Sequence, residues 1–287
     1  MNYSTLIFKI TTTALSISLF AGAALAQNNK DFHLSAAQKR EFANYMTRAA
    51  GAERNRETYP RALEYLDEAL KIDPDSAGAL MMKGEILMKS GEPQLAEPVL
   101  ARVCRLIPKK DEVWYDRARN AYTLNKHADA LEAINHALTL KDCSVYRRLR
   151  CKLYYRAGKV AEAEREAALL VKQEPSNSIN RSDHAEYAAA LGMWDKVATD
   201  MEAATVNTSA KLSNGHHLIF LAQAYDHLHK RDKAIAALKK ALQLFPDSRE
   251  LHVELLRIYK ESGDKVAAAQ EAKALHEIES DYGVPGK

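Results

Sequence analysis

Four histidines near the end of the chain are the residues whose type could most directly bind a metal or carry acid–base chemistry. They occur as two pairs, His216–His217 and His227–His229. Consecutive residues on a helix point about 100° apart, so the members of the first pair do not share a face. No H-E-x-x-H motif or Cys/His spacing accompanies the four. We expect solvated or capping histidines here, with a metal-dependent enzyme built on this His-rich segment as the less favoured alternative.

Three cysteines offer a second set of possible ligands, or a disulfide. The spacing of Cys104, Cys143 and Cys151 fits neither a C-x-x-C motif nor a zinc pattern, and an odd number leaves at least one thiol unpaired within a monomer. A bridge between Cys104 and Cys143 is conceivable in an oxidising compartment. Small buried apolar residues are the preferred interpretation.

Motifs for other chemistry are absent from the sequence, which contains no G-x-S-x-G, Walker loop or G-x-G-x-x-G. Paired acids such as Glu162 and Glu164 belong to a predicted amphipathic helix and are expected on its surface. The 41 basic and 38 acidic residues leave a net charge of +3, which creates no large field for nucleic acid or anionic lipid. We therefore predict a protein that is not an enzyme, needs no cofactor or metal and does not bind nucleic acid.

The N-terminal segment over residues 1–26 has the composition of a secretory signal peptide. A short start with one lysine precedes an apolar run, and Ala24-Leu25-Ala26 before Gln27 forms an A-x-A cleavage site. No cysteine follows that site, which argues against a lipoprotein anchor; an uncleaved N-terminal anchor is the alternative. We expect cleavage after Ala26, no transmembrane span in the mature chain, and a periplasmic or secreted protein.

The remaining sequence is periodic, and the same residue types return every thirty-four positions. Small side chains stand at the eighth, twentieth and twenty-seventh places of most repeats, and mostly larger apolar residues stand at the twenty-fourth. Small residues at these places let two helices approach closely, so each repeat is predicted to be a helical hairpin. The windows are 43–76, 77–110, 111–143, 144–177, 178–211, 215–248 and 249–282, with a lead-in over 27–42, an insertion over 212–214 and a frayed tail over 283–287.

Turn residues agree with these windows. Proline at the thirty-second place of four windows is expected to end the second helix, and the capping box at Ser35 predicts that the first helix of the chain begins near Ala36. The fifteenth place, where the first helix of a hairpin should stop, carries residues that tolerate a positive φ. These residues are Gly91, Asn125, Gly158, Gly192 and Gly263.

Two windows carry a resemblance to a known family. One contains Trp114, Ala118, Ala130 and Ala137, and another contains Leu221, Ala222, Tyr225, Ala234, Leu238, Ala241 and Pro246. Over about residues 43–282 the chain thus resembles tetratricopeptide-repeat (TPR) proteins of the exported bacterial type. The resemblance implies an all-α fold, a right-handed superhelical solenoid of about seven hairpins whose first helices line a concave, ligand-binding wall.

The resemblance also implies which places of each first helix point inward. In the windows that begin at 77, 111 and 144 these places combine thioethers, aromatic rings and cations, which suit an extended peptide bearing carboxylates. The pattern does not reproduce the Lys, Asn, Asn, Lys, Arg clamp of chaperone-binding TPR domains. The predicted partner-binding residues are Met81, Met82, Met88, Tyr115, Arg119, Tyr122, Arg148, Lys152, Tyr155 and Arg156.

Together these features predict a non-catalytic extracytoplasmic scaffold or adaptor. It would bind a partner protein or peptide during envelope assembly, secretion or polysaccharide export. A glycan-binding accessory of an exopolysaccharide export system is the alternative, because tyrosines along a groove can also hold sugars. The sequence leaves the identity of the partner and the oligomeric state open.

Overall fold

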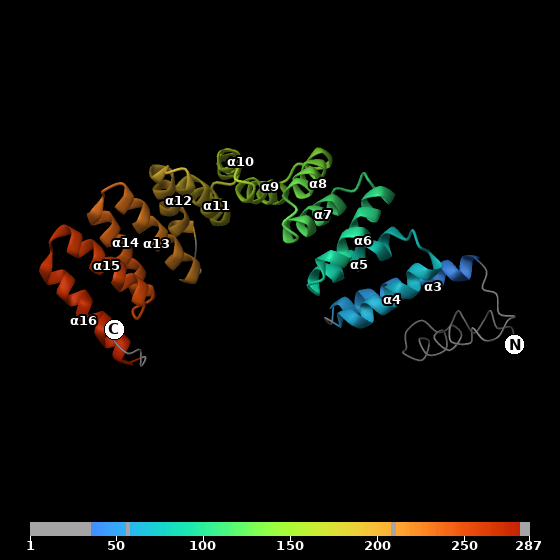
Figure 1. Cartoon of the computed structure of the whole chain (residues 1–287), viewed down its shortest axis with the longest axis horizontal. Helices are drawn as coiled ribbons and strands as arrows, with labels where there is room; N and C mark the ends of the chain where they lie inside the picture. Colours follow the sequence, from blue (N-terminus) through green and yellow to red (C-terminus); the bar gives the residue numbers. More distant parts are fainter. Residues whose placement is uncertain (1–35, 56–57, 208–210, 282–287) are drawn as a thin grey trace. The chain divides into compact units, whose positions relative to one another are not determined.

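The chain is built from helices. A computed structural model describes residues 36–55, 58–207 and 211–281, and within these ranges it contains fourteen helices and no strand (Figure 1). No described helix is both long enough and apolar enough to cross a membrane. The all-α fold predicted from the sequence is confirmed. The predicted signal peptide over 1–26 and the predicted tail over 283–287 lie outside the described residues.

Two compact units make up the chain, residues 1–86 and residues 87–287. The described part of the first unit contains α3 (Ala36–Asn55), α4 (Tyr59–Ile72) and most of α5 (Ala77–Lys89). Its α3 packs on α4, with Ala50, Leu66 and Ala69 fully buried in its core. Ala36, the first described residue, already belongs to α3, and the capping box predicted at Ser35 lies outside the described residues.

Helices α6 to α16 form the described part of the second unit. Each odd-numbered helix from α7 to α15 packs on the helix that follows it, and each resulting hairpin packs on the next. The bounds are α6 (Pro93–Leu106), α7 (Asp111–Thr123), α8 (His127–Leu140), α9 (Ser144–Arg156), α10 (Val160–Gln173), α11 (Ser178–Ala190), α12 (Trp194–Asn207), α13 (Lys211–His227), α14 (Arg231–Leu244), α15 (Arg249–Ser262) and α16 (Lys265–Asp281).

Small residues at the repeated places form the seams between these helices. At the twentieth place, Ala130 and Ala234 are fully buried, as are Ala137 and Ala241 at the twenty-seventh. A larger side chain there would push the helices apart, because interiors are packed to crystal-like density. The predicted close helix contacts are therefore present in the second unit.

Turns between the paired helices also follow the sequence pattern. The four glycines at the fifteenth place have φ between 71° and 79°, and Asn125 has a φ of 57°. His229 occupies the same place in its window and also has a positive φ, 56°. The sequence pattern had not predicted this backbone role for a histidine.

The helix starts compare closely with the predicted windows. Helices α5, α7, α9, α11 and α15 each begin at the first residue of a window. Helix α13 differs because it already begins at Lys211, so the three residues 212–214 inserted in the repeat period lie within this helix. The number of repeats stays a prediction.

Candidate partner-binding site

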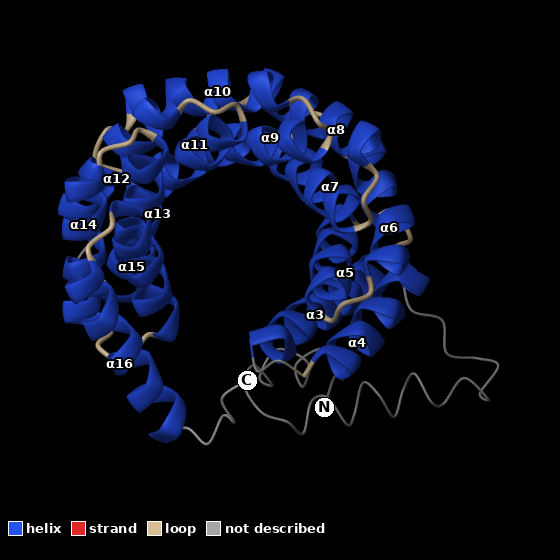
Figure 2. Ribbon diagram, turned by 60° about the vertical axis from the view of Figure 1, so that its left-hand side comes forward, coloured by secondary structure: helices blue, strands red, loops and turns tan. Residues whose placement is uncertain are grey.

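In the second unit, the first helices of the hairpins lie together along one side. Figure 2 shows α7, α9, α11, α13 and α15 on the inner side of the stack and their partner helices on the outer side. We call the surface that these five helices present the inner face. Eight of the ten predicted partner-binding residues belong to the second unit, and seven of them lie on α7 and α9.

Aromatic contacts organise the α7 part of the inner face. The ring of Tyr115 stacks on that of Tyr146, with centroids 4.7 Å apart. The Arg119 guanidinium lies 5.6 Å from the Tyr115 centroid and pairs with Asp116 at 3.3 Å. Arg119 is thus partly engaged within its own helix, while Tyr122 is half-buried near the end of α7.

Helix α9 carries two cations that, unlike Arg119, form no ion pair among the described residues. Lys152 and Arg156, one helical turn apart, are exposed and make no hydrogen bond or ion pair with any residue that the structure describes. Arg148 instead donates a hydrogen bond to the side chain of Asn180 at 3.3 Å. Tyr155 contacts Tyr187, with ring centroids 5.0 Å apart. These last two contacts place α9 beside α11.

The contacts between α9 and α11 involve residues that the sequence analysis did not single out. Tyr187 is buried, and burial raises the pKa of its hydroxyl well above the ordinary value. Asp183 is half-buried, and its Oδ2 accepts no hydrogen bond from the described residues. Burial raises the pKa of Asp183, although the charges of Lys152 and Arg148 oppose that shift. The repeat period could have pointed to Asp183, because it is the sixth residue of its window, a place that the TPR resemblance assigns to the inner side.

The predicted methionines divide between the two units. Met81 and Met82 belong to the first unit, where Met82 packs against the buried core, and Met88 belongs to the second, where it is half-buried. The other predicted residues all lie on α7 and α9. A hollow of about 710 Å³ on the first unit, lined by residues such as Met46 and Tyr65, contains none of the predicted residues.

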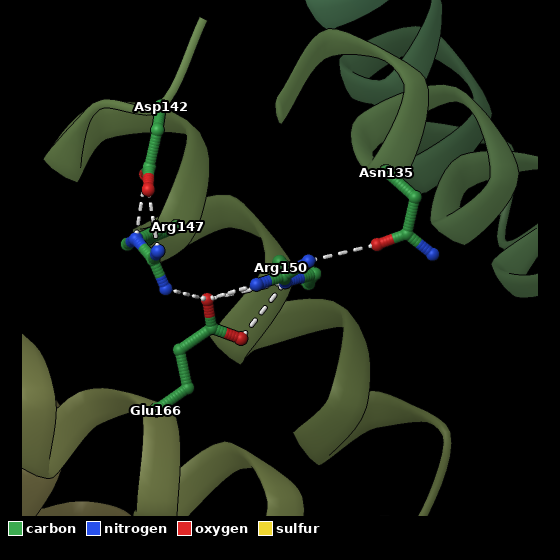
Figure 3. Close-up of polar contacts among 5 residues, drawn as sticks. All are labelled: Asn135, Asp142, Arg147, Arg150 and Glu166. Atoms are coloured by element: carbon green, nitrogen blue, oxygen red, sulfur yellow. Dashed lines mark hydrogen bonds and ion pairs between the residues drawn. The ribbon is translucent and has the colours of Figure 1, made fainter. Parts of the chain in front are cut away.

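A buried carboxylate clamps the two helices of the hairpin that carries Lys152 and Arg156. Glu166 of α10 accepts hydrogen bonds from Arg150 at 2.6 Å and 2.8 Å and from Arg147 at 3.2 Å (Figure 3). Arg147 also forms a paired contact with Asp142, at 2.6 Å and 2.7 Å. Arg150 reaches Asn135 of α8 at 3.0 Å, so the network ties α9 to both neighbouring helices.

The next hairpin repeats this arrangement. Arg181, His184 and Asp200 occupy the places in their window that Arg147, Arg150 and Glu166 occupy in the window before. Arg181 donates to Asp200 at 2.9 Å, and the Nδ1 of His184 lies 2.5 Å from the other oxygen of Asp200. The clamp therefore depends on the repeat period, although the residue types change.

Glu164 belongs to this second network, although the sequence analysis expected it on the surface. It is 5% exposed, contacts the Nε2 of His184 at 3.3 Å and accepts from Lys196 at 2.5 Å. Burial alone would raise the pKa of Glu164, but the hydrogen bonds from Lys196 and His184 lower it below the ordinary value. The expected surface position of Glu164 is thus wrong, because an acid on the outer helix faces a histidine of the following repeat.

Histidines of the sixth window make separate contacts. His216 is exposed, whereas His217 is buried and its Nε2 lies 2.9 Å from the hydroxyl of Ser182. His227 stacks on Trp194 at 3.7 Å. Among the described residues, no group of three or more His, Cys, Asp or Glu side chains could hold a metal ion.

All three cysteines are free. Burial raises the pKa of Cys104 to about 11 and that of Cys151 to about 12, so both remain protonated thiols near neutral pH. The conceivable bridge between Cys104 and Cys143 is not formed.

Comparison with known families matches two segments of the chain, residues 56–104 and 218–248, with models described as tetratricopeptide repeat. The chain contains tetratricopeptide repeats. The second segment coincides closely with the hairpin of α13 and α14. Among curated proteins, none matches the sequence significantly.

Solved TPR structures are similar to the chain in fold. Pseudomonas aeruginosa pilF is 16% identical, with 79% of this chain and 99% of that chain covered and a TM-score of 0.58. The TPR protein YrrB, whose structure is described as having an unusual peptide-binding site, is 18% identical over 68% of this chain and 95% of that one, with a TM-score of 0.53. A chain of the APC/C hetero-tetramer Cut9–Hcn1 is 15% identical, with a TM-score of 0.52. The match covers 77% of the present chain but only 46% of that longer chain. At these identities the likeness shows the fold, an all-α TPR solenoid.

Proposed function

We propose that this protein is an exported, non-catalytic adaptor that binds an extended, acidic segment of a partner protein on the inner face of α7 and α9. TPR solenoids present long surfaces on which one chain can lie across several repeats. The sequence pattern of residues 1–26 supports export, and the absence of catalytic motifs in the sequence supports an adaptor.

The exposed pair Lys152 and Arg156 is the observation that carries the proposal. Other cations on α9 and α11 are neutralised by buried carboxylates: Arg147 and Arg150 pair with Glu166, and Arg181 pairs with Asp200. Lys152 and Arg156 make no hydrogen bond or ion pair among the described residues, although the charge of Lys152 acts on the half-buried Asp183. Both belong to the same helix as the half-buried Tyr155. Cations next to aromatic rings suit carboxylates attached to a peptide chain.

Relatives in fold support the class of partner. YrrB is described as carrying a peptide-binding site, and PilW, which is 17% identical with a TM-score of 0.60, as a type IV pilus biogenesis factor. We infer that this protein likewise holds a peptide or protein partner, and that its work belongs to the cell envelope, in assembly, secretion or polysaccharide export.

Charge reversal on α9 tests the site. The double variant Lys152→Glu and Arg156→Glu should lose the partner in a pull-down from an envelope fraction analysed by mass spectrometry. Arg165→Glu with Lys172→Glu is the matched control, because both residues are exposed cations of the outer helix α10. A partner that both double variants retain as well as the unchanged protein does would show that α9 is not the binding site.

Export is tested separately. Fractionation of cells that produce the chain should place it outside the cytoplasm, and N-terminal sequencing of that material should begin at Gln27. A cytoplasmic protein that retains the segment 1–26 would contradict the proposed location without bearing on the inner face.

A further inference from the structure

Helices α9 and α11 lie side by side in register on the inner face. Arg148 contacts Asn180, and seven residues later along both helices Tyr155 contacts Tyr187. Equal steps along both chains mean that the helices run parallel, with their N-terminal ends together. Residues of equal rank in the two helices therefore stand at equal height on this surface.

Two aliphatic side chains occupy the same rank near these N-terminal ends. Val145 is the second residue of α9 and Ile179 is the second residue of α11, and they are 48% and 55% exposed. Most other exposed large apolar residues of the described chain lie on outer helices or in turns. Val145 shares a helix face with Lys152 and Arg156, because steps of seven and eleven residues return to nearly the same side.

Toward the C-terminal ends of the same two helices, α9 and α11 carry opposite charges. Lys152 and Arg156 make the C-terminal half of α9 cationic, whereas the exposed Glu186 makes the facing half of α11 acidic. The tyrosine pair Tyr155–Tyr187 lies between the two helices. A ligand carboxylate is attracted over α9 and repelled over α11.

We propose, on the basis of the function inferred above, that the partner segment has an amphipathic order: aliphatic side chains on Val145 and Ile179, followed at a fixed distance by carboxylates on Lys152 and Arg156. A rise of 1.5 Å per residue separates Val145 from these cations by roughly 10 to 16 Å along α9. An extended peptide spans that distance in about three to five residues. Glu186 excludes partners whose acidic residues continue across α11.

Defined peptides test this order. A labelled peptide with two leucines, four small polar residues and two aspartates is titrated by fluorescence anisotropy into the purified chain. It should bind about tenfold more tightly than a peptide of equal composition in which leucines and aspartates are interleaved, because only the first places both groups on their contacts at once. Equal affinities for the two peptides would overturn the order.

Aliphatic variants test the apolar half. Val145→Ser with Ile179→Ser should weaken binding of the ordered peptide about tenfold, because the leucines lose their apolar contact. Leu169→Ser is the matched control, since Leu169 is 51% exposed on the outer helix α10. The circular dichroism spectra and unfolding midpoints of all three proteins should agree, because the changed side chains are exposed.

The variants distinguish failure of this inference from failure of the proposed function. Unchanged binding by the serine double variant, with binding lost by Lys152→Glu and Arg156→Glu, would overturn the aliphatic contact and leave the acidic-peptide site standing. Unchanged binding by both double variants, or no binding of any peptide to the unchanged chain at millimolar concentration, would overturn both.

Discussion

At the scale of single residues, the turn inside each hairpin is set by backbone conformation. The residue at the end of the first helix has a positive φ, a region in which a Cβ clashes with the backbone and which glycine enters freely. Near Gly158 no atom lies within 4 Å of an added Cβ. A substitution there is therefore resisted by the backbone conformation alone.

We predict opposite effects for two substitutions at this place. Gly158→Ala should lower the free energy of unfolding by about 1 kcal/mol, because alanine must adopt a φ of 75°. His229→Gly should raise it by up to about 1 kcal/mol, because it removes a side chain from the left-handed region. Urea denaturation followed by circular dichroism measures both, and shifts of the same sign would contradict this account of the turn.

At the scale of elements, buried carboxylates join the helices within hairpins. The Glu166 side chain is 8% exposed, and it neutralises Arg147 and Arg150, whose side chains are each 21% exposed. A carboxylate that accepts hydrogen bonds from two guanidinium groups holds them in a fixed arrangement. The clamp thereby positions α9, the helix that carries Lys152 and Arg156.

Glu166→Gln should destabilise the protein by about 2 kcal/mol. Breaking a fully buried pair costs about 3 to 5 kcal/mol, and the partial exposure of the two arginines reduces the loss. Glu162→Gln on the same helix is the control, because the half-buried Glu162 has no hydrogen bond or ion pair among the described residues. Equal unfolding midpoints for the two variants would show that the clamp contributes little.

His184 should make stability depend on pH. Burial disfavours its charged form, but hydrogen bonds to Asp200 and then Glu164 raise its pKa above the ordinary 6.5. The stabilisation from charged His184 is therefore fully present below pH 6.5 and is lost as pH rises through the raised folded-state value. Lys196 and Arg181 also face the two carboxylates, Lys196 at Glu164 and Arg181 at Asp200.

We therefore expect His184→Asn to lower the free energy of unfolding by about 2 kcal/mol in mildly acidic buffer and by less in alkaline buffer. Glu164 acts with the opposite sign: its lowered pKa gives stability that is present above 4.5 and is lost as pH falls through the lowered value. Urea denaturation in buffers from acidic to alkaline pH measures the contributions of both His184 and Glu164. A loss that is equal at every pH would mean that His184 is not charged in the folded protein.

At the scale of the molecule, the second unit is a linear stack in which each hairpin packs on its neighbours. Stability in such an array is close to a sum of terms for each repeat and each interface, so a defect in the middle can uncouple the two sides. Both tryptophans of the chain lie in this unit, with Trp114 on α7 and Trp194 on α12. They flank the hairpin of α9 and α10 and report on each side.

Leu153→Ala, which empties a fully buried position on α9, should cost about 3 kcal/mol and separate the unfolding of the two sides. The measurement is fluorescence-monitored urea unfolding of two proteins that each keep one tryptophan, made by Trp114→Phe or Trp194→Phe. Their midpoints should move apart when Leu153→Ala is added. If both midpoints shift equally, the stack unfolds as one cooperative block.

Local regularities of the sequence determined the architecture. Alanines at the same places of most repeats and turn residues at the fifteenth place predicted hairpins. The fully buried Ala130 and Ala234 and the positive φ of Gly158 agree with that prediction. These features are readable because helix seams and left-handed turns restrict residue type at one position at a time. The inner-face cations were also named from their rank in the repeat.

Only the tertiary structure decided which polar residues are partners. Glu164 and His184 belong to different repeats, and Glu166 and Arg150 to different helices, so their pairing depends on how helices cross and not on any single spacing. Most charged residues at such spacing face water, which is why Glu164 was expected on the surface. The alignment of α9 with α11 comes from contacts between residues distant in sequence. The tertiary structure also shows that Lys152 and Arg156 are exposed and form no ion pair among the described residues.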